Sequence, residues 1–380
     1  MSANAENSLK VMHIISGLSV GGAEMMLYRL LSYSQLQQQS IVVSLTADGE
    51  LVDKIRQLGI EVIELERGSI ISAIKQLSSV VEQRQPAMLQ SWLYRADLLA
   101  AWVAWRKKLP LIWNVRQTEV GKVRGQTHIW WAQRLSAIVS KIIPRKIVYC
   151  AQAARVSHEK IGYAAAKGVV ICNGIDTQKL VFDESLRRSQ RQTWNAHNDE
   201  MLIGMVGRYD PLKNHARFLR VLRDVRMLCP KTDVKGVLVG RGIHSNNTAL
   251  MTLIQQYGLV GQVLLVEEVA DVLPVYCALD VHLLSSDNEG WPNVLAEAMS
   301  IGLPCVSTNV GDVAFILDEA SAAIDIANED QLAEKVAEYV QLSKSERWKL
   351  GKLNREKIQK NSSLQSSVAR YDDLYLKIDL

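Results

Sequence analysis

Short apolar runs alternate with longer amphipathic stretches along most of the chain. In the first half, the β-branched runs predict strands at 11–15, 41–45, 61–64, 88–90, 111–114, 146–149 and 169–171. Apolar residues at helical spacing between them predict helices at 23–33, 51–58, 96–105 and 128–141. This alternation is typical of βαβ units that build a parallel sheet.

The same rhythm restarts in the second half after a polar interval. Residues 173–176 read Asn-Gly-Ile-Asp, a turn signal, and a charge-rich stretch follows to about residue 200. Beyond it we expect strands at 202–206, 234–239, 263–266, 281–284 and 305–307, and helices at 216–228, 247–257, 272–278 and 292–301. Residues 329–380 predict helices alone.

The chain therefore predicts an α/β protein with two Rossmann-like, doubly wound domains that face a central cleft. We expect the first domain at 1–185 and the second at 195–362. In such folds ligands bind where the carboxyl ends of strands meet the first turns of helices.

Composition excludes several other classes of protein. Hydrophobic residues make up 48% of the 380 residues and charged residues 22%, which is ordinary for a soluble globular protein. The polar start is unlike a signal peptide, and no run reaches the roughly 18 apolar residues of a membrane span. The five scattered cysteines include no C-x-x-C pair, which favours reduced thiols over disulfides or zinc. We therefore expect a cytoplasmic protein.

Positive charge is concentrated in one part of the first domain. Residues 81–170 contain 15 Lys and Arg against 4 Asp and Glu. Basic residues in 106–108 and 122–146 could attract an anionic membrane surface, supported by nearby tryptophans: Trp102, Trp105, Trp113, Trp130 and Trp131. The alternative is that these rings fill the core and the charges are merely solvated. Nucleic-acid binding is disfavoured, because tryptophans at helical spacing usually belong to a core.

Two loops carry features suited to phosphate. Gly21 and Gly22 follow the first strand and open a helix, where a backbone without side chains lets an anion approach free N–H groups. An ordinary tight turn explains the same glycines. Arg208 follows a strand directly, and Lys213 precedes the next helix. Two cations at such a turn can converge on a diphosphate, unless they are only surface charges.

A third loop places two glutamates eight residues apart. Glu289 lies in the loop after a strand, and Glu297 lies in the following helix among small and apolar residues. A carboxylate in those surroundings needs a partner. At the start of that helix we expect free backbone N–H groups that can bind an anion, contributed by Asn293, Val294 and Leu295.

These loops resemble those of the retaining nucleotide-sugar glycosyltransferases of family 4, which have the GT-B fold. The matching stretches are G-G-x-E at 21–24, N-G-I-D at 173–176, V-G-R-x-D-P-x-K-N-H at 206–215, V-G-R-G at 239–242 and E-G-x-P-N-V-x-x-E-A-M-x-x-G-x-P at 289–304. They cover nearly the whole chain in the family's order. The resemblance also implies that a C-terminal helix, about 363–380, crosses back onto the first domain.

The resemblance implies a role for each matching residue. Arg208 and Lys213 would bind the donor diphosphate and stabilise the charge that builds on it, Glu289 would contact the transferred sugar, and Glu297 would hold the ribose hydroxyls. The amides of 293–295 with Gly22 would complete the phosphate cradle, and Arg241 and Val269 would flank the base. No D-x-D motif stands at a strand end, so we expect no metal and no cofactor besides the nucleotide sugar, with UDP favoured.

The first domain departs from the family at one position. Many relatives carry a histidine in the loop after the strand at 111–114, where this chain has Arg116. Arg116 could bind a phosphate or an acidic acceptor, or it could be an ordinary surface arginine.

The sequence thus predicts a retaining hexosyltransferase that acts on a glycan or lipid-linked acceptor in surface polysaccharide or glycolipid synthesis. A nucleotide-sugar epimerase and a non-catalytic nucleotide-sugar-binding protein of the same fold are the alternatives. An epimerase needs no second substrate, and a binding protein has no need of all four residues Arg208, Lys213, Glu289 and Glu297.

Overall fold

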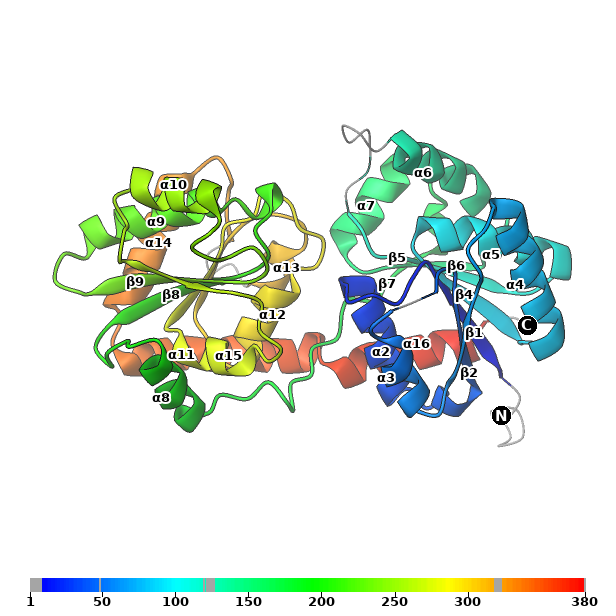
Figure 1. Cartoon of the computed structure of the whole chain (residues 1–380), viewed down its shortest axis with the longest axis horizontal. Coiled ribbons are helices and arrows are strands. Elements are labelled where there is room, and N and C mark those ends of the chain that lie inside the picture. The colour runs from blue at the N-terminus through cyan, green and yellow to red at the C-terminus, as the bar shows by residue number, and fades with distance from the viewer. Residues whose placement is uncertain (1–8, 48, 119, 121–126, 318–322, 379–380) are drawn as a thin grey trace. The chain divides into compact units, whose positions relative to one another are not determined.

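The computed structural model describes residues 9–47, 49–118, 120, 127–317 and 323–378. The chain divides into two compact units (Figure 1). Unit 1 comprises Met1–Gly174 and Leu364–Leu380, and unit 2 comprises Ile175–Ser363. The division at Gly174 precedes residue 185, where we expected the first domain to end.

Unit 1 is built on a parallel sheet of seven strands in the order β3-β2-β1-β4-β5-β6-β7. The strands are β1 (Val11–Ile15), β2 (Ser40–Ser44), β3 (Glu61–Glu64), β4 (Met88–Trp92), β5 (Leu111–Val115), β6 (Lys146–Tyr149) and β7 (Gly168–Val170). The central strands are buried along their whole length, because helices cover both faces of a parallel sheet. That double burial explains their nearly continuous apolar sequence.

Two groups of helices cover the unit 1 sheet. On one face α2 (Gly22–Tyr33), α3 (Val52–Gln57) and α16 (Leu364–Leu376) share a core with β1. The others are α4 (Ile70–Arg84), α5 (Tyr94–Lys107), α6 (Thr127–Ser140) and α7 (Gln152–Lys160), and α5 packs against both α4 and α6.

Helix α16 is tied to unit 1 by buried polar contacts as well as by apolar packing. The Asp372 carboxylate accepts hydrogen bonds from the Ser34 hydroxyl at 2.5 Å and from the Gln35 N–H at 3.1 Å. Tyr371 and Tyr375 are fully buried, and their hydroxyls bond to Asn114 and Gln90 of the central sheet. The end of the chain is thus an integral part of unit 1.

Unit 2 repeats the architecture with six parallel strands in the order β10-β9-β8-β11-β12-β13. The strands are β8 (Met201–Val206), β9 (Val234–Val239), β10 (Val263–Val266), β11 (Val281–Leu284), β12 (Cys305–Thr308) and β13 (Ala323–Ile324). The helices are α8 (Glu184–Thr193), α9 (His215–Leu228), α10 (Thr248–Gln256), α11 (Leu273–Ala278), α12 (Asn293–Ser300), α13 (Val313–Ile316), α14 (Glu329–Gln341) and α15 (Lys344–Asn361). The predicted fold class, two parallel-sheet Rossmann-like domains, is confirmed.

Four helices (α4, α7, α8 and the four-residue α13) and one short strand, β13, were not predicted from the pattern. Helix α4 buries Ala73, Leu77 and Val81 at helical spacing, so its signal was present in the sequence. Helix α7 buries only Ala154 and His158, a weaker signal. Helix α8 occupies the polar stretch that we took for a linker.

Helix α8 buries a charged side chain in place of an apolar face. Arg191 is its one buried residue, and the guanidinium bonds Asp280 and the carbonyl oxygens of Ala278, His197 and Glu200. Arg187 of the same helix also donates to Asp280, at 2.7 Å, so α8 docks through two arginines. A hydrophobic periodicity cannot show such a helix.

The five cysteines are free and buried. In the part of the chain that the structure describes, no helix is both long and apolar enough to cross a membrane.

Helix α15 packs backbone to backbone against the turn that follows α12. A Cβ atom on Gly351 would overlap the carbonyl oxygen of Gly302, whose own φ of +85° favours glycine. We expect Gly351→Ala to lower the free energy of unfolding by about 1–3 kcal/mol through overpacking. This outweighs the roughly 0.5–1 kcal/mol that alanine normally gains over glycine within a helix.

Thermal or urea unfolding of unit 2 measures this effect. Lys349→Ala, at an exposed position of the same helix, is the matched control and should change stability by less than about 0.5 kcal/mol. A Gly351→Ala variant that is more stable than the parent would contradict the contact.

Candidate functional site

The carboxyl edge of the unit 2 sheet changes direction between β8 and β11. These strands are parallel neighbours, but the chain continues from β8 to β9 on one side and from β11 to β12 on the other. Loops that leave such a pair diverge and open a crevice, which is where α/β sheets bind ligands. The two loops here are 207–214 and 285–292, and they contain Arg208, Lys213 and Glu289.

Hydrogen bonds to backbone carbonyl oxygens join the two loops. The Asp287 N–H donates to the Leu212 carbonyl at 2.8 Å. The Ser285 hydroxyl lies 3.1 Å from the carbonyl oxygens of both Lys213 and Asn214. On the other side, the Thr308 hydroxyl at the end of β12 donates to the Ser286 carbonyl at 2.6 Å. These contacts fix the position of one loop relative to the other.

Lys213 and Glu289 meet across the two loops. The Lys213 ammonium donates to Glu289 Oε1 at 2.5 Å, and the Ser286 hydroxyl donates to the same oxygen at 2.6 Å. Both charged side chains are largely buried, with 18% and 12% of their surface exposed. Charge-assisted hydrogen bonds of this kind are stronger than neutral ones. The structure thus brings together two residues that the sequence separates widely.

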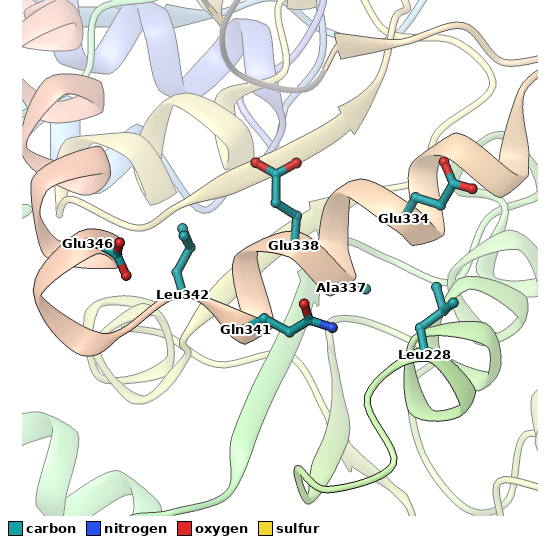
Figure 2. A pocket seen from close by; sticks show the side chains of 7 residues that line it. All are labelled: Leu228, Glu334, Ala337, Glu338, Gln341, Leu342 and Glu346. Atoms are coloured by element: carbon teal, nitrogen blue, oxygen red, sulfur yellow. The ribbon is translucent and has the colours of Figure 1, made fainter.

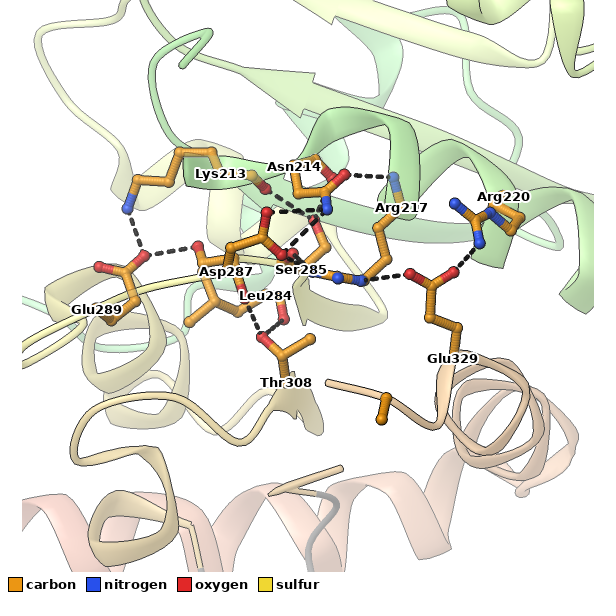
Figure 3. A network of polar contacts seen from close by, with 12 residues as sticks. Lys213, Asn214, Arg217, Arg220, Leu284, Ser285, Asp287, Glu289, Thr308 and Glu329 are labelled. Atoms are coloured by element: carbon orange, nitrogen blue, oxygen red, sulfur yellow. Dashed lines mark hydrogen bonds and ion pairs between the residues drawn. The ribbon is translucent and has the colours of Figure 1, made fainter. Parts of the chain in front are cut away.

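Arg217 of α9 holds the base of this arrangement (Figure 3). Its guanidinium donates to Asp287 at 2.5 Å, to Glu329 at 3.0 Å and to the Ser285 carbonyl at 2.8 Å. Only 7% of the side chain is exposed. A buried cation is tolerated when its donors are satisfied, and here they tie the loop after β11 to α9 and α14.

Asn214 shapes the loop between Lys213 and helix α9. It adopts a left-handed conformation (φ +46°), and its side-chain oxygen accepts the Arg217 N–H at 3.0 Å as the helix N-cap. Its amide nitrogen donates to both oxygens of Asp287, at 3.1 and 3.2 Å. Asparagine is among the few residues other than glycine that accept this conformation readily.

Glu297 has the partner that its surroundings require. The buried Tyr276 hydroxyl lies 3.1 Å from Glu297 Oε2 and 3.2 Å from the Val294 carbonyl oxygen. Burial, together with the neighbouring Glu297 carboxylate, raises the pKa of Tyr276 well above its usual value. The phenol therefore stays protonated and can serve as a donor to the carboxylate.

Arg208 and Lys213 pair with different carboxylates. Arg208 is exposed and pairs with Asp210 at 2.9 Å. Arg241 is also exposed, at 3.5 Å from Glu268, and Val269 lies half-buried in the loop after β10. The loops of Arg208 and Arg241 are nevertheless adjacent, because the Tyr209 N–H donates to the Arg241 carbonyl at 2.8 Å.

A glycine of the loop after β12 allows a close approach to Glu289. Gly311 has φ +58°, and a Cβ atom there would overlap the Glu289 carbonyl oxygen. The adjoining Asp312 N–H donates to the Gly290 carbonyl at 3.0 Å. The backbone that carries Glu289 is therefore held from the β12 side as well.

One expected anion contact changes at the start of α12. The Leu295 N–H, which we expected to be free, donates to the Pro292 carbonyl oxygen at 3.2 Å in a tight first turn. Leu295 therefore leaves the expected set of anion-binding amides.

In unit 1, Arg116 is not an ordinary surface arginine. Its guanidinium donates to Asn173, and at 3.3 Å each to Asn114 and to the Tyr371 hydroxyl. The same group lies 5.8 Å from the centre of the Trp92 ring. Arg116 thus connects the end of β5 with the turn at 173–176 and with α16.

The paired glycines stand at the carboxyl end of β1. Gly21 is the N-cap of α2, where a Cβ atom would come within 2.5 Å of the Glu24 carboxylate. Around Gly22 there is open space on the Cβ side among the described residues. This arrangement leaves the start of α2 accessible at Gly22.

The sequence analysis missed the residues that position the site, namely Asn214, Arg217, Tyr276, Ser285 and Asp287. Arg217 gave one usable signal, since it falls among the apolar positions of the core-facing side of α9. Tyr276 and Ser285 gave none, because their partners are distant in sequence.

A pocket of about 500 Å³ lies elsewhere on unit 2 (Figure 2). It is lined by Leu228, Glu334, Ala337, Glu338, Gln341, Leu342 and Glu346. Leu228 ends α9, which runs back from the carboxyl edge of the sheet, so this pocket lies at the opposite edge from Lys213. Its three carboxylates also make it unsuited to a diphosphate. Among the described residues, no three His, Cys, Asp or Glu side chains form a group that could hold a metal ion.

Two family models match the chain, one in each half. The model described as Glycosyltransferase Family 4 matches residues 20–179, and the one described as Glycosyl transferases group 1 matches residues 200–341. The putative glycosyltransferase EpsF of Bacillus subtilis is 22% identical over 86% of this chain and 85% of its own length. The capsular polysaccharide biosynthesis glycosyltransferase CapM of Staphylococcus aureus is 20% identical over 87% and 88%.

Solved structures agree with this assignment at the level of the fold. HepE of Anabaena, crystallised in complex with UDP, superposes with a TM-score of 0.82 at 17% identity and covers 97% of this chain and 100% of its own. The matches on both halves, the two parallel sheets and this shared architecture lead to one conclusion: the chain belongs to the group 1, family 4 glycosyltransferases and has the GT-B fold.

Proposed function

We propose that this glycosyltransferase moves a sugar, with retention of configuration and without a metal, from a nucleotide-sugar donor to a glycan or lipid-linked acceptor. The observation that supports it most is the buried Lys213–Glu289 pair at the point where the unit 2 sheet changes direction. A cation and a carboxylate at one place suit a ligand that presents both a phosphate and sugar hydroxyls.

Lys213 and Arg208 supply the positive charge for the donor diphosphate. The C–O bond between the sugar and the phosphate breaks, and the electron pair stays on the phosphate, where negative charge grows. A fixed ammonium stabilises that charge more in the transition state than in the ground state. The acceptor oxygen forms the new bond to the anomeric carbon from the same face, and its proton passes to the leaving phosphate.

The remaining unit 2 residues orient the donor. Glu289 accepts a hydrogen bond from a hydroxyl of the transferred sugar, and Glu297, held by Tyr276, accepts from the ribose hydroxyls. The amides of Asn293 and Val294 face the phosphates, and Arg241 and Val269 flank the base. A carboxylate that accepts from two adjacent hydroxyls selects a ribose over a deoxyribose.

The unit 1 residues serve the acceptor side of the proposal. Arg116 is held by Asn114, Asn173 and Tyr371, so its charge is fixed in position and suits an anionic acceptor group. Gly21 and Gly22 leave the first turn of α2 open to a phosphate.

The named relatives favour UDP as the donor nucleotide and a role in surface polysaccharide assembly. HepE is described in complex with UDP, and CapM as a capsular polysaccharide biosynthesis enzyme. An enzyme of such a pathway works on the cytoplasmic face of the cell membrane, and peripheral contact with an anionic leaflet is part of the proposal.

Glu297→Ala is expected to weaken nucleotide binding by about 1–3 kcal/mol, the usual cost of losing a hydrogen bond to a charged group. Calorimetry with UDP and GDP measures the loss. Glu338→Ala, on the distant surface of α14, is the matched control and should bind as the parent does. Unchanged affinity of Glu297→Ala for both nucleotides would remove the ribose assignment.

Lys213→Ala is expected to lower turnover on the order of a hundredfold, because its interaction strengthens as charge develops on the phosphate. Release of nucleoside diphosphate from a panel of nucleotide sugars measures turnover, and product analysis shows whether a second substrate is glycosylated. The parent should remain active in EDTA. Near-normal turnover of Lys213→Ala would refute its role, and an epimerised donor without transfer would favour the alternative activity.

Arg217→Met tests whether the network beneath the site positions Lys213 and Glu289. Arg217 ties the loop after β11 to α9, so its loss should displace Glu289 by about one ångström and lower kcat about tenfold or more. Nucleotide binding, which depends on Glu297, should stay largely intact. Arg217→Lys should restore part of kcat. Arg223→Met, which removes a partly exposed ion pair with Asp224 on the same helix, is the control. Equal kcat for both methionine variants would contradict the positioning role.

A further inference from the structure

Helix α6 of unit 1 presents a continuous apolar stripe to solvent. Trp131, Leu135 and Ile138 lie on the helix, and Ile142 lies in the turn that follows it. Between 51% and 75% of each residue is exposed. Their spacing of four, three and four residues places them on one side of the helix. We call these four residues the α6 stripe.

The α6 stripe is not the face that α6 uses to join its own unit. Within 129–140, the part of α6 whose side chains the structure describes, the buried residues are Gln133, Ser136, Ala137 and Ser140, and α6 packs against α5. The polar and small side chains thus face inward, and the large apolar ones face outward. This arrangement is the reverse of the usual pattern, and an exposed apolar patch of this kind indicates a binding surface.

Positive charges accompany the stripe. Arg134, Lys141 and Arg145 are exposed beside it. No carboxylate within the described residues pairs with any of these three side chains. Over residues 120–158 the sequence contains seven Lys and Arg and no Asp or Glu. The α6 stripe therefore lies in a segment whose charged residues are all cationic.

We infer that the α6 stripe and its three flanking cations dock this protein on an anionic lipid bilayer. Apolar side chains enter the boundary between headgroups and acyl chains, while Lys and Arg contact lipid phosphates. Tryptophan is enriched at that depth.

The structure corrects our expectation of which residues dock. Trp113 is fully buried in β5 and cannot take part, whereas Arg106 and Lys108 are exposed at the end of α5. Residues 122–126 lie outside the described residues. Trp102 and Trp105 are exposed on the neighbouring α5 and extend the apolar surface of this unit. The docking element is thus α6 with the turn after it.

Docking would give the proposed transferase access to a lipid-linked acceptor. The proposed function already includes contact with an anionic leaflet, and the α6 stripe is the surface that would make it. Access to the acceptor rests on that function. Failure of the docking and failure of the sugar transfer can be distinguished, because vesicle binding and transfer are measured separately. A chain that binds vesicles but transfers no sugar would refute the function and leave the surface in place.

Sedimentation of the full chain with vesicles tests the inference. Vesicles of phosphatidylcholine with phosphatidylglycerol should bind the parent at low salt, and binding should weaken as salt rises. Ile138→Glu with Ile142→Glu should reduce the partition coefficient at least tenfold. Lys141→Glu with Arg145→Glu should reduce it about fivefold or more for each cation removed.

The matched control is Trp348→Glu with Leu353→Glu, which removes two similarly exposed apolar residues from α15 of unit 2. It should bind vesicles as the parent does. Donor hydrolysis without vesicles should be unchanged in all three double variants, which shows that they fold. Absence of binding at low salt, equal binding to pure phosphatidylcholine, or stripe variants that bind normally would overturn the inference. So would a dimer that the stripe variants abolish, because a second copy would then cover the stripe.

Discussion

The parallel pairing of β8 with β11 is the constraint on which the unit 2 site depends. Parallel strands place their carboxyl ends at one edge, and the chain leaves these two strands toward opposite sides. Their loops must therefore diverge from a common point, and whatever they contain is brought together there. Lys213 and Glu289 lie close together because of this backbone topology. Their electrostatic attraction then adjusts only the geometry of the contact.

Burial of these charges sets strict conditions on their neighbours. A buried ion loses hydration worth several kcal/mol, and Coulomb attraction offsets this only with good geometry and additional hydrogen bonds. Ser286 supplies a second donor to Glu289, while Asp287, Glu329 and a carbonyl oxygen share the donors of Arg217. The site thus consists of a network of hydrogen bonds around Arg217 and the adjoining Lys213–Glu289 pair.

The nearby histidines do not contribute charge to this site at neutral pH. Burial and the adjacent Lys213 lower the pKa of His215 to about 4, so its ring is neutral and packs against Tyr209. The cationic character of the loop after β8 therefore belongs to Arg208 and Lys213. Unit 1 shows a different use of charge, since Arg134 of α6 and two cations that follow the helix, Lys141 and Arg145, lie near exposed apolar side chains.

The sequence by itself determined the two parallel sheets, most of their strands, and the loops that contain the candidate residues. It did so because strands buried on both faces need continuous apolar runs, and because glycines, prolines and charged residues at strand ends are local signals. It also indicated that Glu297 needs a partner. These properties depend on neighbours in the chain, so a pattern can show them.

Tertiary structure alone decided which polar residues meet. Tyr276 reaches Glu297, Arg217 reaches Glu329, and Arg191 docks a helix that has no apolar face, all through contacts between distant parts of the chain. It also separated Trp113, buried in a strand, from Trp131, exposed on a helix, although both lie in the same basic and aromatic segment. The physical reason is that burial and hydrogen-bond partners are set by packing in three dimensions, which residue order does not specify.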